Sequence, residues 1–362
     1  MRRGSRLAAI ALVLAAPSVA GEWARIVAPP ALSFPSDHGS HASFRTEWWY
    51  ATGQLADPGG HRYGFQITFF RQGLDPSPPA PGSSALRARQ VLAAHLVIAE
   101  IGQNKPRFAE RVRRAALGLA GAAENDLDVF LEDWEMRRLA NGAMAVVADD
   151  RDTGLALTLE LQPVKPLVLH GEGGVSRKGP EPGNASVYVS YTRLAARGSL
   201  TLDGRERAVQ GAAWFDHEWG STQLGAGVVG WDWLGLRLAD GRDLMLYRLR
   251  AADGSAAPQA AGTLVERDGT ARHLAATEFA IEPLSWWTSP RTGARYPARL
   301  RVRVPEAGLD LEVRPEVPDS ELDARASTGT VYWEGPVAVA GTAAGEGYDE
   351  LTGYAGDTLT RF

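Results

Sequence analysis

Three titratable residues stand side by side near the middle of the chain: Asp216, His217 and Glu218. On a β-strand successive side chains point to opposite faces, so Asp216 and Glu218 share one face with Trp214, while His217 points to the other. The two acidic residues then lie about 6.5 to 7 Å apart along the backbone, which suits a general acid and a general base acting on one molecule. Because burial beside tryptophan disfavours a charged carboxylate, we expect one of the two to stay protonated near neutral pH.

The same three residues also allow a structural interpretation, in which they form a hydrogen-bonded plug between two β-domains and satisfy one another's buried polar groups. A metal site is disfavoured, because neighbouring strand residues point to opposite faces. His38 and His41 lie in a Pro-, Ser- and Gly-rich segment and are interpreted as solvated histidines. We therefore expect no metal and no cofactor. The chain has no Gly-x-Ser-x-Gly elbow, phosphate-binding glycine loop, His-Glu-x-x-His motif or cysteine, which leaves hydrolases of those classes unsupported.

Aromatic residues accompany the acidic pair. Residues 212–233 hold four of the eleven tryptophans, and a second aromatic run, Glu47-Trp48-Trp49-Tyr50, lies near the start of the mature chain. Aromatic side chains bind apolar ligands, and their faces stabilise cations. Tyr188 and Tyr191 point to opposite sides of one strand, so at most one of them lines a given cavity. The expected substrate-binding residues are Trp48, Trp49, Tyr50, Tyr191, Trp214, Trp231 and Trp233.

The elements that must position these residues are mostly short antiparallel strands separated by turns such as Asn141-Gly142 and Asp203-Gly204. Such spacing is typical of a β-sandwich or barrel. The segment from Lys105 to Leu119 has apolar residues at a spacing that predicts one short amphipathic helix. A proline-rich loop at 74–87 is expected to cover a barrel mouth. In the first half, strands are expected at 47–57, 63–71, 91–100, 129–138, 143–148, 155–161, 187–194 and 199–202.

Each half of the chain opens in the same way, with an aromatic strand, a tight turn and a strand that ends in an aromatic residue followed by arginine. An offset of 183 residues places Trp48 over Trp231 and Tyr50 over Trp233, and Phe70-Arg71 over Tyr247-Arg248 after a shorter turn. We infer a duplication of one β-unit. Glu47 and Arg71 are expected to form an ion pair that closes the first barrel, with anchoring of a polar ligand end as the alternative. His95, inside an apolar run, is expected to be a hydrogen-bonded core histidine.

Length and composition fit an exported protein of two domains. The chain has 362 residues, a net charge of −5 and interspersed charges, so nucleic acid is excluded as an expected partner. Arg2, Arg3 and Arg6 precede an apolar run and a small-residue cleavage signature, which predicts a signal peptide cut after Ala20. The expected location is therefore periplasmic or secreted. The expected parts are residues 1–20 as signal peptide, 21–44 as an arm, 45–218 as the first domain and 219–362 as the second.

Four motifs spread over most of the mature chain resemble the AttH and carotenoid 1,2-hydratase family of lipocalin-like proteins. They are Glu47-Trp48-Trp49-Tyr50, Trp214-Phe215-Asp216-His217-Glu218-Trp219-Gly220, Gly230-Trp231-Asp232-Trp233 and Tyr332-Trp333-Glu334-Gly335. The resemblance implies an all-β fold of two tandem lipocalin-like antiparallel barrels. In the hydratase branch it further implies cofactor-free addition of water to a double bond of an acyclic carotenoid.

Alkene hydration needs a proton delivered to carbon, giving a cation that water captures. Asp216 would supply the proton and Glu218 or His217 would position water, within an aromatic barrel cavity. The expected activity is that of a hydratase or lyase acting on an isoprenoid or lipid-like molecule. One alternative is a non-catalytic periplasmic carrier of a hydrophobic ligand, associated with the membrane surface or with an ABC-type export system. Another is a glycosidase-like carboxylate pair in an open aromatic groove. The sequence leaves the oligomeric state undetermined.

Overall fold

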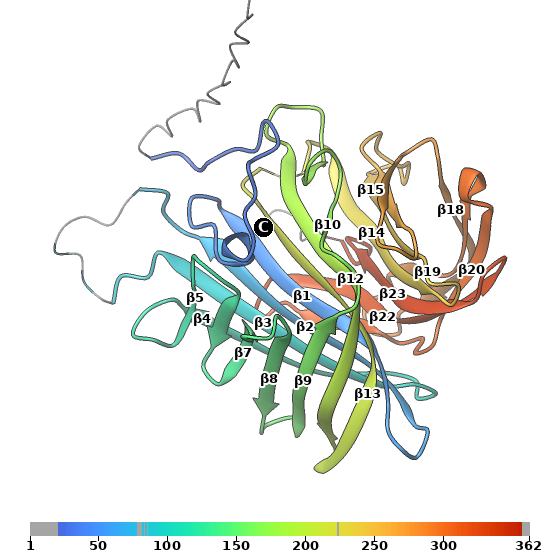
Figure 1. The fold of residues 1–362 in the computed structure, drawn as a ribbon, viewed down its shortest axis with the longest axis horizontal. Coiled ribbons are helices and arrows are strands. Elements are labelled where there is room, and N and C mark those ends of the chain that lie inside the picture. Colours follow the sequence, from blue (N-terminus) through green and yellow to red (C-terminus); the bar gives the residue numbers. More distant parts are fainter. Residues whose placement is uncertain (1–20, 78–81, 83, 85, 223, 357–362) are drawn as a thin grey trace, which may run out of the picture.

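Two curled antiparallel sheets make up the protein in the computed structural model, which describes residues 21–356 except 78–81, 83, 85 and 223. In Figure 1 the first sheet, coloured blue to yellow-green, curls below and to the left of the second, coloured yellow to red. The helices of the described residues are two single 3-10 turns, η1 (Ser36–His38) and η2 (Pro305–Ala307). No helix within the described ranges is both long and apolar enough to cross a membrane. The expected all-β fold of tandem lipocalin-like units is confirmed.

The first sheet contains thirteen strands and closes into a nearly complete barrel, with the strand order β4-β3-β2-β1-β13-β12-β9-β8-β7-β6-β5 and with β10 and β11 also paired to β12. Its strands are β1 (Thr46–Ala56), β2 (Arg62–Gly73), β3 (Gln90–Glu100), β4 (Arg107–Arg114), β5 (Ala120–Ala122), β6 (Asp128–Leu131), β7 (Trp134–Arg138), β8 (Met144–Asp150), β9 (Leu155–Pro163), β10 (Val168–Leu169), β11 (Val175–Arg177), β12 (Ala185–Leu202) and β13 (Arg205–Gly220).

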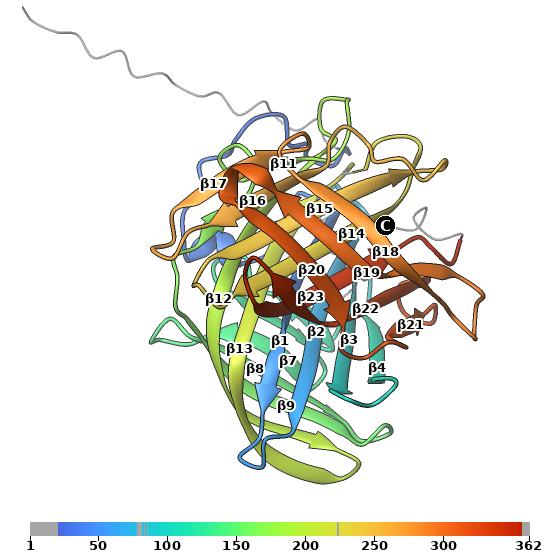
Figure 2. The ribbon, with the colours of Figure 1, turned by 90° about the vertical axis from the view of Figure 1, so that its right-hand side faces the viewer.

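The second sheet contains ten strands and forms a half-barrel, with the order β17-β16-β15-β14-β23-β22-β20-β19-β18 and with β21 paired to β22. Figure 2 shows this sheet from its own side, in front of the first. Its strands are β14 (Val228–Leu238), β15 (Asp243–Ala251), β16 (Ala261–Val265), β17 (Ala271–Ala275), β18 (Ala280–Thr288), β19 (Arg295–Val304), β20 (Leu309–Pro315), β21 (Glu321–Ala324), β22 (Thr330–Gly341) and β23 (Gly345–Thr352).

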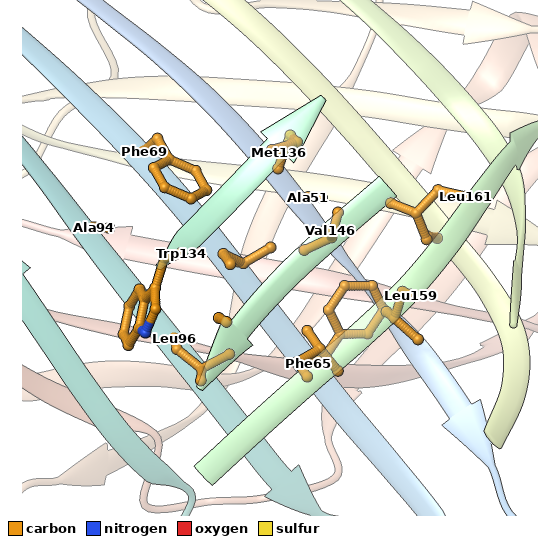
Figure 3. Packing of buried hydrophobic residues seen from close by; sticks show 14 of the residues in the cluster. Ala51, Phe65, Phe69, Ala94, Leu96, Trp134, Met136, Val146, Leu159 and Leu161 are labelled. Carbon is orange, nitrogen blue, oxygen red and sulfur yellow. The ribbon is translucent and has the colours of Figure 1, made fainter. Parts of the chain in front are cut away.

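The interior of the first barrel is filled by apolar side chains rather than by a ligand cavity. Figure 3 shows Phe65 and Phe69 of β2 packed against Trp134 and Met136 of β7 and against residues of β8 and β9. Alternation along β1 sends Trp49 and Ala51 into this core. Dense packing of this kind leaves few voids larger than a water molecule.

The outer faces of the two sheets meet, so that β1 and β13 of the first lie against β14, β22 and β23 of the second. Tyr50 of β1 donates a hydrogen bond to Glu334 Oε1 of β22 at 2.6 Å, and Gln54 Nε2 donates to the Val337 carbonyl at 3.1 Å. Because β1 is packed on both faces, seven consecutive residues, 49–55, are buried. The contact between the sheets is therefore a second core with polar groups in it.

Three details differ from the sequence expectations. The segment 129–138, expected as one strand, forms two strands, β6 and β7, which pair across a turn at 132–133. The predicted helix at 105–119 is wrong, because residues 107–114 form strand β4, paired in register with β3. Pairing with the edge of an existing sheet stabilises an extended conformation more than helix propensity opposes it. The segments expected as separate strands at 187–194 and 199–202 are one strand, β12, which pairs along its length with β13 and contains an irregularity after Tyr191.

The hairpins that open the two sheets resemble each other, as the expected repeat requires: in each, an acidic residue of the first strand faces an arginine of the second. Glu47 faces Arg71 across β1 and β2, and Asp232 faces Arg248 across β14 and β15. Both pairs are ion pairs, at 2.8 Å for Glu47 and Arg71. This register places Trp48 opposite Phe70 and Trp233 opposite Tyr247. It therefore matches Trp48 with Trp233, two positions beyond the offset inferred from sequence.

Candidate active site between the two sheets

Asp216 of β13 lies between the sheets, as its strand alternation predicts, together with Trp214 and Glu218. Its side chain is 4% exposed and accepts three hydrogen bonds. Oδ1 accepts from the Trp214 indole N–H at 2.5 Å and from the Ser190 hydroxyl. Oδ2 accepts from the Tyr188 hydroxyl at 2.7 Å. Since each carboxyl oxygen has two lone pairs, both lone pairs of Oδ1 are occupied, and the free one on Oδ2 is the place left for a proton.

The acidity of Asp216 is set by burial. Removal from water and, to a smaller extent, the nearby charge of Glu218 raise the pKa of the carboxyl to about 7, against the opposing effect of the three donors. Near neutral pH a proton therefore resides on Asp216 in part of the molecules. A carboxyl group in this state can donate that proton to a bound molecule, as a general acid must.

Glu218 lies two residues further along β13, in a different environment. Lys178 Nζ forms an ion pair with its Oε1 at 3.1 Å, and the Ser186 hydroxyl donates to the same oxygen. Burial lowers the pKa of Lys178, but the charge and hydrogen bond of Glu218, together with Tyr247 and Asp216, outweigh burial, so that the pKa is raised overall. The ammonium group also lies 4.0 Å from the centre of the Tyr247 ring. The two carboxyls on this face of β13 therefore differ in how their charge is balanced. Glu218 is paired with the charge of Lys178, whereas Asp216 carries a proton in part of the molecules.

The second sheet contributes two further buried carboxyls that sequence reasoning did not assign to the site. Burial raises the pKa of Glu334 well above its usual range, and the charge of Glu350 adds to the shift. Burial raises the pKa of Glu350 to about 7, and its Oε1 accepts from the Trp231 indole N–H at 2.9 Å. Glu334 belongs to the motif Tyr332-Trp333-Glu334-Gly335. Its position next to a tryptophan in that motif is the sequence feature that could have indicated a buried carboxyl at the site.

An aromatic cluster surrounds these carboxyls. It contains Tyr50, Tyr188, Trp214 and Trp233 as buried members, with Trp48 and Trp231 partly buried against them. The Trp233 indole N–H donates to the Tyr188 hydroxyl at 2.9 Å. A residue of the second sheet therefore holds in place the tyrosine that donates to Asp216. Trp214 and Trp233 meet edge to face. Five of the seven expected substrate-binding residues are therefore brought together here: Trp48, Tyr50, Trp214, Trp231 and Trp233.

The other expected residues lie elsewhere. Trp49 points into the first barrel, where its ring stacks on His217. Tyr191 lies on the opposite face of β12 from Tyr188, with its hydroxyl 3.4 Å from His38 Nε2. Of the two tyrosines, the one beside Asp216 is thus Tyr188. The alternation rule allowed only one of them, but it could not say which.

His217 belongs to an ion-pair network at the mouth of the first barrel, away from Asp216. Its Nε2 and the Nδ1 of His41 lie 2.9 and 2.8 Å from Glu47 Oε1, and Arg71 donates to Oε2 at 2.8 Å. These hydrogen bonds and the Arg71 charge lower the pKa of Glu47 although burial opposes them. The expected Glu47 and Arg71 ion pair is confirmed. The prediction of solvated histidines is wrong, because His41 is held in this network and His38 is buried.

The same network contains a group of side chains that could bind a metal ion. His41, Glu47 and His217 bring three potential ligand atoms within 4.8 Å of one another. However, the Arg71 guanidinium is fully buried against the same carboxylate and would repel a metal ion. The hydrogen bonds that Glu47 accepts from Arg71 and shares with the two histidines account for the position of these side chains. We therefore do not assign them as metal ligands.

A cavity of about 560 Å³ opens beside the aromatic cluster. Its wall is mostly apolar and includes Met245, Tyr247, Pro258 and Ala261, with His170 as a polar group. Met245 and Tyr247 also belong to the aromatic cluster, so the cavity and the cluster share a wall. The site therefore lies between the sheets rather than within a barrel, where it was expected, because the barrel interior is filled.

The chain resembles known proteins in family and in structure. A profile described as AttH-like matches residues 25–354. The crystal structure of an AttH candidate from Nitrosomonas europaea superposes with a TM-score of 0.83 at 38% identity, covering 91% of this chain and 99% of that one. The crystal structure of kievitone hydratase from Nectria haematococca has the same fold, with a TM-score of 0.66 at 14% identity over 92% of this chain and 96% of that one.

No curated protein sequence matches the chain. The family profile spans most of the chain, and the bacterial structure exceeds a third in identity over nearly its whole length. The chain belongs to the AttH-like family.

Proposed function

We propose that the protein is a cofactor-free hydratase or lyase that adds water to a double bond of an apolar, isoprenoid or lipid-like molecule. The observation that carries the proposal is the state of Asp216: a buried carboxyl with a pKa of about 7, three donors on its two oxygens and an aromatic surround. One protein of the same fold is named a hydratase, which supports the fold and leaves the reaction to be tested.

In the proposed reaction, Asp216 gives its proton from Oδ2 to one alkene carbon, and the alkene π electrons form the new C–H bond. The neighbouring carbon becomes cationic, and the faces of Trp214 and Trp233 stabilise that charge. Water then forms the C–O bond and loses a proton to Glu350, whose pKa of about 7 suits a base at neutral pH. One proton leaves Asp216 and one reaches Glu350, so exchange with solvent restores both groups.

The cavity of about 560 Å³ beside the cluster is proposed to hold the rest of the ligand. Its volume lies in the range of small-molecule sites, which are mostly apolar with few polar groups. Polar side chains also line its wall, among them Glu172, Arg177, Gln259 and His273, and these would bind a polar end of an otherwise apolar ligand.

A second candidate function is that of a hydrophobic-ligand carrier. It is favoured by the fact that Asp216 is not among the residues lining this cavity. In that case the ligand occupies the cavity alone, and the aromatic cluster serves as a rigid junction. Under either function we propose that the chain is exported after cleavage at Ala20. N-terminal sequencing of protein recovered outside the cytoplasm tests this.

The deciding experiment begins with native mass spectrometry of the protein purified from its own host, to identify the bound molecule. The released ligand is then incubated with ligand-free protein in H₂¹⁸O, in parallel with Asp216→Asn. We expect ¹⁸O in the product with the wild type and none with the variant, which should still bind ligand. An unchanged ligand with both proteins would support the carrier. Equal incorporation by both would remove Asp216 from the mechanism.

A further inference from the structure

His170, which follows strand β10, contacts both hydroxyl donors that hold Asp216. Its Nε2 lies 2.7 Å from Ser190 Oγ, and Ser190 in turn donates to Asp216 Oδ1. Its ring also packs on the ring of Tyr188, with centroids 4.2 Å apart, and Tyr188 donates to Asp216 Oδ2. The side chain is 1% exposed, so these contacts are held in a buried position.

The other ring nitrogen is fixed by the second sheet. His170 Nδ1 lies 2.8 Å from Thr263 Oγ1 of β16. Burial lowers the pKa of His170 to about 3, so the ring is neutral and carries one N–H. A chain of hydrogen bonds therefore runs from Thr263 through His170 and Ser190 to Asp216, and it joins the two sheets.

A neutral imidazole with one partner on each nitrogen donates through one nitrogen and accepts through the other. If Nε2 carries the hydrogen, His170 donates to Ser190, and the serine proton is free to point at Asp216 Oδ1. If Nδ1 carries it, Ser190 must donate to His170, and Oδ1 loses its serine donor unless Oδ1 itself is protonated. Trp214 already donates to Oδ1 at 2.5 Å, which disfavours a proton there.

We propose that His170 is a positioning residue for Asp216: in the Nε2–H form, with Nδ1 accepting from the Thr263 hydroxyl, it directs the Ser190 hydroxyl onto Oδ1 and so confines the acid proton to Oδ2. This inference deepens the proposed function, since it names the residue that selects which oxygen gives up the proton. It requires no change in protonation of His170 itself. Thr263 donates to Nδ1, Nε2–H donates to Ser190, and Ser190 donates to Asp216.

The groups facing this chain come from several elements. Tyr188 and Ser190 lie on β12, and Glu218 lies on β13. Around the imidazole are Lys178, whose charge acts on it, and His273 of β17. Glu334 of β22 accepts a hydrogen bond from Tyr50 of β1, and the charge of Asp216 acts on Glu334. A test must therefore separate the effect of His170 on the titration of Asp216 from the effect of a general change in these surrounding charged groups.

Two substitutions separate the two ring nitrogens. His170→Gln places an amide N–H near the position of Nε2 and can still donate to Ser190. His170→Asn places its amide near the position of Nδ1, can still reach Thr263, and loses the link to Ser190. Ser190→Ala removes the donor itself and serves as the reference for a complete loss.

The matched control is His95, a second fully buried histidine in a similar chain. Its Nδ1 lies 2.8 Å from Tyr332 OH and its Nε2 lies 2.8 Å from Ser327 Oγ, while Ser327 also donates to Glu110. This chain likewise joins the two sheets but ends on a different carboxyl. His95→Asn therefore reports what loss of a buried histidine does to the fold alone.

The readout does not depend on a substrate. Trp214 donates directly to Asp216, so tryptophan fluorescence should report the titration of Asp216, and Asp216→Asn must abolish the transition near pH 7. Loss of one hydrogen bond to a charged group raises the pKa of a carboxyl by about one unit. We expect an upward shift of this size in Ser190→Ala and His170→Asn, and a midpoint close to the wild type in His170→Gln and His95→Asn.

The tautomer itself is read from the ¹⁵N shifts of the His170 ring, where the wild type should show a protonated Nε2 and a bare Nδ1. A protonated Nδ1 would overturn the proposal. Equal midpoints for His170→Asn and the wild type, alongside a shifted Ser190→Ala, would overturn it as well, and so would equal shifts in His170→Asn and His170→Gln. Failure of the hydration assay with these titration results intact would reject the proposed function but leave the role of His170 standing.

Discussion

Replacement of Asp216 by asparagine should stabilise the protein at alkaline pH while removing its activity. The substitution keeps the size of the side chain and an oxygen that accepts from Trp214 and Ser190. The Tyr188 hydroxyl, which already accepts from Trp233, can accept one more hydrogen bond from the new amide. What the variant loses is the capacity to become charged in a buried site.

The magnitude follows from the raised pKa. Between the unfolded value of 3.8 and the folded value of about 7, the folded state binds more protons than the unfolded state, so stability falls as the pH rises. The penalty is fully present above pH 7. From pH 5 to pH 7 it grows over two units at about 1.4 kcal/mol each, and the stability of Asp216→Asn relative to the wild type should therefore increase by about 3 kcal/mol between pH 5 and pH 8.

The assay is urea unfolding of both proteins at fixed ionic strength, followed by tryptophan fluorescence, at pH 5, 6, 7 and 8. Asp152→Asn, at an exposed position, is the control and should follow the wild type throughout. A difference between Asp216→Asn and the wild type that does not change with pH would refute the assignment of a near-neutral pKa. A difference that changes in favour of the wild type would show that Asp216 is a charged structural residue, held as an anion by its three donors.

Three further predictions concern the supports of the site. Glu47→Gln leaves the Arg71 charge buried without its partner and should lower the unfolding free energy by about 3 to 5 kcal/mol; a loss under about 1 kcal/mol in urea unfolding would contradict the network. Gly53→Ala places a Cβ 2.3 Å from the Ala212 carbonyl oxygen and should separate β1 from β13, seen as loss of soluble protein or of amide protection in both strands. Glu350→Gln should lower kcat and leave the ligand Kd unchanged, whereas unchanged kcat would remove Glu350 as the base.

Much of the fold follows from local sequence patterns. The period-two sequence pattern from Arg45 onward and the turn residues between strands predict an antiparallel sandwich or barrel. The separation of Trp214 and Phe215 onto opposite faces of β13 is as alternation requires. The segment at 107–114 was misassigned as a helix because its apolar spacing fits both periods, and only pairing with β3 decides between them.

The sequence predicts the relative positions of site residues only where those residues lie on the same strand. Asp216 and Glu218 stand on one strand face, so their proximity could be inferred. Glu334, Glu350 and His170 reach the same place from β22, β23 and the residues after β10, and their positions depend on how the two sheets dock. No local pattern encodes that docking, and for the same reason the site was expected inside a barrel instead of between the sheets.

Transfer of a solvent proton to carbon is the central step of this account, and deuterium incorporation measures it most directly. The ligand released from the native protein is incubated in D₂O with the wild type, Asp216→Asn and the structural control Asp152→Asn, and the product is examined by mass spectrometry and NMR. The account predicts one non-exchangeable C–D bond per molecule of product, at one face of one carbon, with the wild type and the control, and none with Asp216→Asn. Product formed by the wild type without deuterium on carbon, or with equal deuterium from Asp216→Asn, would contradict it.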